Sequence, residues 1–341
     1  MRWNFVTKNQ KAAIFNSIYL IIFFSIAALS MQVFSILVFS LGVIFVVELF
    51  SKFFIKFLKM PKKFAILISI LIIFISLIFL LVFLIPTVIG EVSNFINFLN
   101  GIFEKQEWRE LFPEKFDDIE KNVTEFLITL RPKIISFIND ALIQMPNLGG
   151  KIGSFIFYLV LITIYGSFYF DSFKLKAGNL FPKSIRNTSI SFLKDLYVNL
   201  KSFVISTLFA ALFVGIGAFI IMNILGVKYS LLMSFWAALT NFIPIVGVIF
   251  EFIPLILVGI SSGLTKMLIL LLIMIILHTS AFIFFLYVMK GSARINPVAV
   301  IISILIFGYI FGFVGPIIAV PIGISIKVFW KHFISPTFER S

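Results

Sequence analysis

One carboxylate of this chain lies inside an otherwise apolar stretch, where an acid is costly. Glu251 stands in a run of apolar residues, seven positions after Pro244. A charged group within a lipid-embedded helix raises the free energy by several kcal/mol unless it is protonated, paired or hydrated. Glu251 is therefore a candidate site for binding a proton or a cation. An equally good interpretation is a structural carboxylate that pairs with Lys228, with Lys266 or with a second copy of the chain.

Three further polar residues lie within or next to the apolar segments. His278, followed by Thr279 and Ser280, is a second candidate for proton or cation binding, although a single helical histidine is more often a packed, hydrogen-bonded residue. Asn241 and Asn296 each precede a proline, and their amides can bind a polar solute or cap a broken helix. The sequence has no Cys, no metal-ligand spacing and no phosphate-binding glycine loop. It therefore predicts no metal site, no cofactor and no enzyme.

Two apolar segments are too long for one membrane crossing and lack the charged turn expected between two crossings. They are residues 229–262 and 298–329, with 34 and 32 residues. Helix breakers stand at the centre of each, from Asn241 to Gly247 in the first and from Gly312 to Pro316 in the second. Proline removes a helix donor and glycine permits unwound backbone. Each segment is therefore predicted to be a broken or re-entrant helical hairpin.

The composition places these segments in a membrane protein. Of the 341 residues, 61% are apolar and only 13% are charged, whereas soluble domains have about 25% charged residues. The apolar residues form long uncharged blocks, as in helices surrounded by lipid or by other helices. We therefore expect an all-α membrane protein with about eight hydrophobic segments. The net charge of +13 follows the distribution of loops across the membrane and predicts no nucleic-acid partner.

The charges are divided between the two sides of the membrane. Ten of the fifteen acidic residues lie between 87 and 149, whereas the other loops are basic. The positive-inside rule then places both termini in the cytoplasm and 87–149 outside, as a small cap of two or three helices separated by prolines such as Pro132 and Pro146. In this topology Glu48 and Asp171 lie at the ends of spans, where water at the boundary is enough to explain them.

The spans predict five parts of the chain. The first apolar block, 14–50, is too long for one crossing and is expected to fold back at Ser30. The five parts are three N-terminal spans (1–86), the acidic loop (87–149), a fourth span with a basic loop (150–202), a transport core of two span-plus-hairpin repeats (203–331) and a tail (332–341). The loop that contains Lys290 and Arg294 is more basic than the loop after 262, which favours re-entrant hairpins arranged as an inverted pair.

The two interrupted segments carry motifs that resemble those of a known family. The motif residues are Asn241, Pro244, Gly247 and Pro254 in the first segment, and Asn296, Pro297, Ser303, Gly312, Gly315 and Pro321 in the second. In this arrangement the chain resembles the autoinducer-2 exporter family of bacterial membrane proteins, over all eight hydrophobic segments. The resemblance implies a multi-pass, homo-oligomeric transporter of the bacterial inner membrane with cytoplasmic termini. The family name comes from export of a furanone-derived quorum signal, and other members are associated with sodium/proton antiport.

The chain departs from the family pattern at positions that bear on ion binding. Val248 stands where relatives usually have a proline soon after the first tip glycine. Ser280 and Leu286 stand where relatives have an acidic residue and a downstream proline in the span before the second hairpin. If that acid binds ions in relatives, its role here is lost or has passed to Glu251.

These features predict a secondary transporter that moves a small polar solute, such as a quorum-signal-like molecule, across the bacterial cytoplasmic membrane. The residues expected to bind or gate the solute are Asn241, Pro244, Gly247, Asn296, Pro297, Gly312, Gly315, Pro316 and Pro321. Glu251 and His278 are expected to bind a coupling proton or cation. Two alternatives stay open: a cation/proton antiporter of the same family that uses Glu251, and an oligomeric membrane scaffold that transports nothing.

Overall fold

The protein was analysed as a computed structural model, which describes residues 7–106, 108–109, 117–243, 246–289, 297–312 and 314–338. In these ranges the chain forms helices and no strand. Seven helical stretches within them are long and apolar enough to cross a membrane: Lys8–Ala27, Met31–Leu58, Lys62–Lys105, Gly153–Leu180, Arg186–Ile224, Leu264–Val288 and Gly315–Ile334. The structure therefore confirms an all-α membrane protein.

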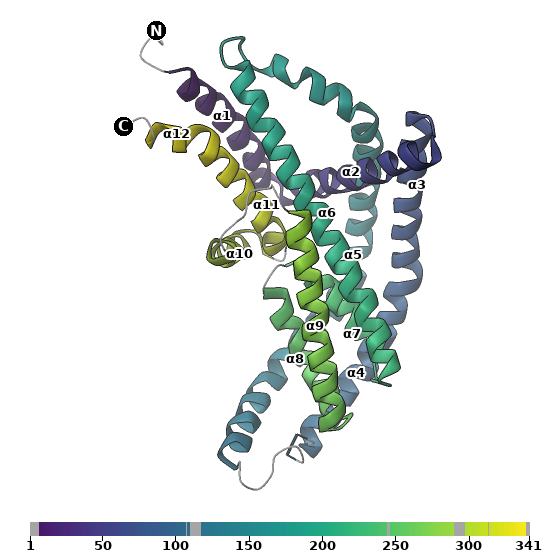
Figure 1. Cartoon of the computed structure of the whole chain (residues 1–341). Coiled ribbons are helices and arrows are strands. Elements are labelled where there is room, and N and C mark those ends of the chain that lie inside the picture. The colour runs from purple at the N-terminus through teal and green to yellow at the C-terminus, as the bar shows by residue number, and fades with distance from the viewer. Residues whose placement is uncertain are drawn as a thin grey trace. The chain divides into compact units, whose positions relative to one another are not determined.

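The helices follow one another as labelled in Figure 1. They are α1 (Lys8–Leu29), α2 (Met31–Leu58), α3 (Lys62–Phe79), the π-helical turn η1 (Leu80–Leu84), α4 (Ile85–Lys105), α5 (Asp117–Lys176), the 3-10 turn η4 (Ala177–Leu180), α6 (Arg186–Ile224), α7 (Ser230–Thr240), α8 (Val246–Ile260), α9 (Leu264–Val288), α10 (Pro297–Phe311), α11 (Val314–Phe329), the π-helical turn η5 (Trp330–Ile334) and α12 (Ser335–Phe338). Three apolar helices, α7, α8 and α10, are too short to cross alone.

Ser30 joins α1 to α2. Its backbone N–H donates to the carbonyl of Ile26 at 2.8 Å, which ends α1, and its Oγ accepts from the N–H of Val33 at 3.3 Å, which begins α2. A serine is favoured at a helix N-cap because its hydroxyl satisfies one of the free N–H groups of the first turn. The structure thus confirms that the first apolar block folds back at Ser30.

The helices between 87 and 149 differ from those expected from the sequence. α3, η1 and α4 form one helical stretch, Lys62–Lys105, and α5 continues through Pro132 and Pro146. A proline inside a helix removes one backbone hydrogen bond and strains one turn, while the turns on either side keep their bonds. A helix of 60 residues withstands two such losses. The expectation that Pro132 and Pro146 separate short helices is therefore wrong.

The described helices pack into two units. The first comprises Met1–Ile75, Gly153–Ser206 and Tyr287–Ser341, and the second comprises Ser76–Ile152 and Thr207–Leu286. Four helices, α3, α5, α6 and α9, contribute to both, α9 only by its last two residues to the first. The five-part division expected from the sequence depends on which side of the membrane each loop occupies, so it stays a prediction.

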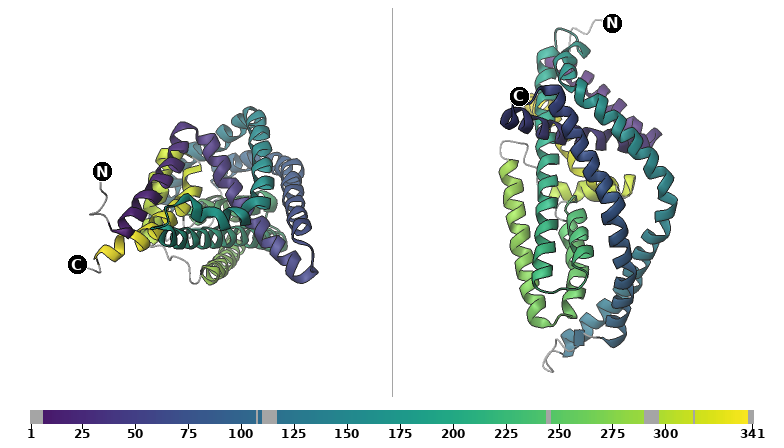
Figure 2. Two further views of the ribbon diagram at one scale, coloured as in Figure 1. Left: turned by 90° about the horizontal axis from the view of Figure 1, so that it is seen from above. Right: turned by 90° about the vertical axis from the view of Figure 1, so that its right-hand side faces the viewer.

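The second half of α6 forms the apolar core of the second unit together with α7, α8 and α9. A Cβ atom on Gly217 would lie 2.7 Å from Cδ1 of Leu277, and one on Gly215 would lie 2.8 Å from Cβ of Ala238. Small residues at helix contacts let membrane helices approach closely. Figure 2 shows α9 running alongside α6 within this unit. Buried side chains of this core include Val214, Met222, Leu255, Val258, Leu270 and Met274.

α4 holds the first turn of α7 in the second unit. Oε2 of Glu91 accepts a hydrogen bond from the backbone N–H of Leu232 at 3.0 Å, and the hydroxyl of Tyr229 donates to the carbonyl of Asn94 at 3.2 Å. A carboxylate at a helix N-terminus satisfies a free N–H and interacts favourably with the helix dipole. The start of the first hairpin is thereby fixed to α4.

In the first unit, α1 and α2 pack against α11 through the buried side chains of Ala27, Phe34, Ile318 and Ile322. A separate cluster joins α2 to α3 through Val47, Ile66 and Ile70. These contacts place the second hairpin against the N-terminal helix pair.

Candidate functional site

α7 and α8 form the first hairpin, and the helix is interrupted after Thr240. The amide nitrogen of Asn241 donates to the carbonyl of Ala237 at 2.9 Å, so this side chain caps the end of α7. A Cβ atom on Gly247 would lie 1.8 Å from the carbonyl oxygen of Thr240. Only glycine fits so close to the backbone of the first arm. The interruption expected at the centre of 229–262 is confirmed.

α10 and α11 form the second hairpin in the same manner. Gly312 has φ of +58°, the left-handed conformation typical of a glycine that ends a helix. A Cβ atom on Gly315 would lie 1.9 Å from the carbonyl oxygen of Phe307, and Pro316 lies against Gly308. Pro321 lies inside α11, and its carbonyl accepts a hydrogen bond from the hydroxyl of Ser325 at 2.9 Å. The interruption expected at the centre of 298–329 is also confirmed.

The two hairpins share one construction. In each, the second arm begins with valine and glycine, Val246-Gly247 in α8 and Val314-Gly315 in α11. In each, that glycine touches a backbone carbonyl of the first arm, and a proline follows inside the second arm. This likeness supports the predicted pair of repeats. Re-entry, inversion and contact between the two tips stay predictions.

The arms of the first hairpin are also joined by a tryptophan. Pro254 lies inside α8 and has no N–H, so the carbonyl of Phe250, four residues earlier, lacks its helical partner. The indole Nε1–H of Trp236 on α7 donates to that carbonyl at 3.0 Å. α7 therefore satisfies the acceptor that the proline leaves open in α8.

Glu251 and His278 meet between α8 and α9. Nε2 of His278 lies 3.0 Å from Oε1 of Glu251, whose side chain is 2% exposed. Oε2 of Glu251 is buried and has no hydrogen-bond partner among the described residues. Two proton-binding groups at hydrogen-bond distance, with one oxygen still open, can hold a proton or contribute a ligand to a cation.

Among the described residues, Glu251 forms no ion pair with Lys228 or Lys266, and pairing with a second copy of the chain stays a prediction. Its ion-pair partner is His278, while the ammonium group of Lys228 lies over the ring of Phe98. Thr279 and Ser280, next to the histidine, donate to carbonyls of their own helix. The structure thus brings together the two candidates for proton or cation binding, which are 27 positions apart in the chain.

The expected solute-binding residues belong to different units. Asn241 and Gly247 belong to the second unit, whereas the residues of the second hairpin belong to the first. Pro244 and Asn296 lie outside the described residues, and Pro297 is described only by its backbone, as the first residue of α10. The predicted solute path between the tips therefore stays a prediction.

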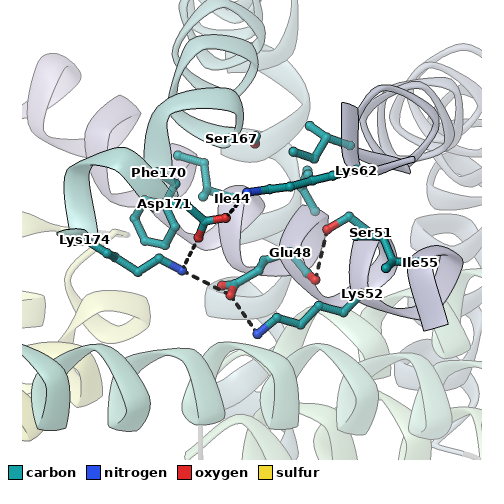
Figure 3. A pocket seen from close by; sticks show the side chains of 12 residues that line it. Ile44, Glu48, Ser51, Lys52, Ile55, Lys62, Ser167, Phe170, Asp171 and Lys174 are labelled. Carbon is teal, nitrogen blue, oxygen red and sulfur yellow. Dashed lines mark hydrogen bonds and ion pairs between the residues drawn. The ribbon is translucent and has the colours of Figure 1, made fainter. Parts of the chain in front are cut away.

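The expectation that boundary water is enough to explain Glu48 is wrong. Glu48 on α2 has a side chain only 13% exposed, and it pairs with Lys52 at 2.9 Å, Lys201 at 2.8 Å and Lys174 at 3.4 Å. The hydroxyl of Tyr197 donates to Oε2, the oxygen that Lys201 also contacts. Figure 3 shows this carboxylate beside Lys52 and Lys174. Glu48 thus links α2 to α5 and α6.

Asp171 on α5 extends this group of charges to α3. Its carboxylate pairs with Lys174 at 2.7 Å and with Lys62, the first residue of α3, at 2.5 Å. Sequence patterns show only the local pairs, i and i+4 for Glu48 and Lys52 and i and i+3 for Asp171 and Lys174. The other partners lie on distant helices, and no spacing in the sequence indicates them.

Helices long enough to span a membrane, interrupted hairpins and a buried carboxylate together have the construction of a membrane transport protein. Comparison with known sequences gives the family. Residues 17–335 match the model of the AI-2E family transporters, and the chain belongs to this family.

Relatives cover almost the whole chain. One protein of Thermotoga maritima, described as a transport protein, is 30% identical over 97% of both chains. A second from the same organism is 26% identical over 96% of this chain and 99% of its own length, and YrrI of Bacillus subtilis is 22% identical over 82% and 81%. Both are also described as transport proteins. The chain is thus a membrane transporter and not an enzyme, as predicted.

Proposed function

We propose that this protein is a secondary transporter that moves a small polar solute across the bacterial cytoplasmic membrane. The observation that carries the proposal is the interruption of two apolar segments at their centres, each fixed by a glycine packed on a backbone carbonyl of the opposite arm. Non-helical backbone at membrane depth is tolerated only where it is buried in protein or lines a cavity. Discontinuous helices of this kind form the solute sites of many secondary transporters.

The tips of the hairpins would bind or gate the solute. In the first tip the Asn241 amide nitrogen is engaged in capping α7, so backbone groups between 241 and 247 are the expected contacts of the solute. In the second tip the expected contacts are backbone groups around Gly312 and Gly315. A small hydroxylated carbonyl compound, which resembles a quorum signal, has the donors and acceptors to bind such groups.

Glu251 and His278 would couple this movement to a proton or a monovalent cation. The pair lies on α8, the second arm of the first hairpin, and on the adjacent α9. Binding of an ion to the open oxygen of Glu251 would change the net charge within the hairpin. Because a charge in the membrane interior is costly, this binding would favour a different conformation of the hairpin. This observation also favours the second candidate function, a cation/proton antiporter that uses Glu251 without an organic solute.

The proposal includes the topology and the assembly. The termini would lie in the cytoplasm, the acidic residues of 87–149 would face outward, and several copies of the chain would associate in the inner membrane. The basic loops and the acidic segment support this orientation through the positive-inside rule.

Vesicles containing the purified protein test the proposal. We expect uptake of a small hydroxylated carbonyl compound that responds to a proton or sodium gradient, and we expect Glu251→Gln to abolish the response to the gradient. The matched control is Glu125→Gln, which removes an exposed carboxylate from α5. Ion exchange without movement of any organic solute would favour the antiporter. Failure to move either ions or solutes would overturn the transport mechanism proposed here.

A further inference from the structure

A cavity of about 170 Å³ lies in the first unit between α2, α3 and α5. Its polar lining includes Glu48, Lys52, Lys62, Asp171 and Lys174, and Figure 3 shows these side chains converging from the three helices. The cavity belongs to a different unit from Glu251 and His278. The inference drawn from it does not depend on the proposed function.

The charges around the cavity do not balance. Four ammonium groups, those of Lys52, Lys62, Lys174 and Lys201, surround the two carboxylates. Glu48 contacts three of these lysines and Asp171 contacts two, and Lys174 contacts both carboxylates. The group therefore has an excess of two positive charges, which an anion of one or two negative charges would compensate.

A hydroxyl group without a partner also lines the cavity. Oγ of Ser167 is buried and has no hydrogen-bond partner among the described residues, although it lies on α5 one turn before Asp171. Buried polar atoms are nearly always hydrogen-bonded, so one without a partner calls for an explanation. A hydroxyl and nearby ammonium groups are together a donor set for the oxygens of a phosphate group.

Apart from Ser51, whose hydroxyl donates to the carbonyl of Glu48, the remaining walls of the cavity are apolar. Ile44, Val47, Ile66 and Phe170 line it, and Ile55 at its edge is exposed. Large apolar side chains on the same helices, including Phe53, Phe57 and Phe64, are exposed in the chain, as expected for a surface that contacts lipid. The lysines thus stand where the ends of predicted spans meet the headgroup layer, and basic side chains there attract anionic lipids.

From these observations we propose that the cavity between α2, α3 and α5 binds the phosphate group of an anionic phospholipid. The phosphate would accept from Lys62, Lys174 and Ser167, and the acyl chains would lie along the exposed apolar side chains of α2 and α3. A phosphodiester carries a single negative charge at neutral pH, so it reduces the excess of two positive charges to one. Lys62 and Lys174 line the cavity, whereas Lys56 and Lys63, near the linker between α2 and α3, do not, so only the first two would contact the bound phosphate.

Native mass spectrometry of the purified full chain, titrated with phosphatidylglycerol or with phosphatidylcholine, tests this site. We expect tighter binding of phosphatidylglycerol, and a loss of about fivefold in its affinity for each of Lys62→Gln and Lys174→Gln. The matched control is the double variant Lys56→Gln/Lys63→Gln, which removes two exposed charges from the same linker but none from the cavity. It is expected to keep most of the affinity. Lys62→Arg, which keeps the charge, is expected to bind as the natural protein does.

Three results would overturn the proposal. An equal loss in the control variant would assign the binding to general electrostatic attraction. Equal binding of phosphatidylglycerol and phosphatidylcholine would show that the excess charge selects no anion. Full competition by inorganic phosphate at the concentration of the lipid would assign the cavity to a free anion. A thermal unfolding curve for each variant shows whether the fold is intact, and Ser167→Ala, which removes no charge, gives a second measure of binding if a lysine variant fails to fold.

Discussion

Nε2 of His278 lies 3.0 Å from Oε1 of Glu251, across the contact between α9 and α8. The carboxylate is buried at 2% exposure, and its second oxygen has no partner among the described residues. A buried acid with a single partner depends strongly on that partner, because loss of the partner leaves the carboxylate without compensation. The pair therefore predicts a large and specific energetic coupling.

His278→Ala is expected to destabilise the protein by about 3–5 kcal/mol, because it leaves Glu251 buried and unpaired. Adding Glu251→Gln to this variant should recover much of the loss, since a neutral amide needs no charged partner. The coupling energy is measured from the unfolding free energies, in detergent, of the natural protein, the two single variants and the double variant. If the losses of the two single variants simply added up in the double variant, the energetic coupling between Glu251 and His278 would be refuted.

His332→Ala is the matched histidine control. Its partner Asp195 keeps Lys331 at 3.2 Å and is itself 36% exposed. The expected loss of ion-pair energy is below about 1 kcal/mol, because Asp195 is partly exposed and keeps a second cationic partner.

Trp236→Phe is expected to destabilise the first hairpin by about 0.6 to 1.7 kcal/mol, the range for hydrogen bonds between membrane helices. The loss arises because the carbonyl of Phe250 loses its donor. In the background of Pro254→Ala the same substitution should cost less, because Ala at 254 supplies an N–H to that carbonyl. The measurement is the unfolding free energy of the natural protein, of each single variant and of the double variant. An equal cost of Trp236→Phe in both backgrounds would refute the role assigned to Trp236.

Gly247→Ala and Gly315→Ala are expected to open their hairpins. The added Cβ would lie 1.8 Å or 1.9 Å from a backbone oxygen, so the second arm must move. Overpacking of this kind costs about 1–3 kcal/mol or more. Gly101→Ala is the control, because no atom lies within 4 Å of the new Cβ in α4. It should stabilise the protein by up to about 1 kcal/mol, as alanine does in helices. Thermal unfolding of the three variants is the measurement.

Glu48→Gln is expected to be strongly destabilising, by about 3–5 kcal/mol, because three ammonium groups lose their shared carboxylate. The control is Glu120→Gln, whose partner Arg109 is 53% exposed and whose loss should cost below about 1 kcal/mol. Unfolding at low and high ionic strength measures both effects. A loss in Glu48→Gln no larger than in the control would contradict the central position assigned to Glu48.

The topology has a direct test because the chain has no cysteine. A single cysteine at Ser262 or at Ser292 is labelled in intact cells with a maleimide that does not cross the membrane. Re-entrant hairpins require labelling at 262 and protection at 292. Full crossings by both segments require the reverse.

The sequence was sufficient for features that depend on local signals. The turn at Ser30 and the two interruptions follow from the length of an apolar run and the position of its polar residue, proline or glycine. Their physical cause lies within a few residues, so a pattern can show it. The continuity of α5 through Pro132 and Pro146 cannot be predicted in this way, because a proline weakens a helix locally while the full length of the helix decides whether it persists.

The contacts between helices could not be predicted in the same way. Glu251 and His278 are both recognisable in the sequence as isolated polar residues, but their pairing depends on how α8 and α9 are rotated about their axes. The surroundings of Glu48 require partners from α5 and α6, more than a hundred positions away. Hydrophobicity alone leaves the rotation of an apolar helix undetermined when every face is apolar.

The shared cap at Ser30 has a consequence for how the N-terminal region can vary. One residue ends α1 and begins α2, so the pair has no spare chain in its connection. Removing or adding a single residue there would turn the whole of α2 by about 100° about its axis. Such a change would move Phe34 away from Ile318 and Glu48 away from Lys174 and Lys201, its partners on other helices. We expect length variation among relatives to fall elsewhere, and the register between these two helices to be kept.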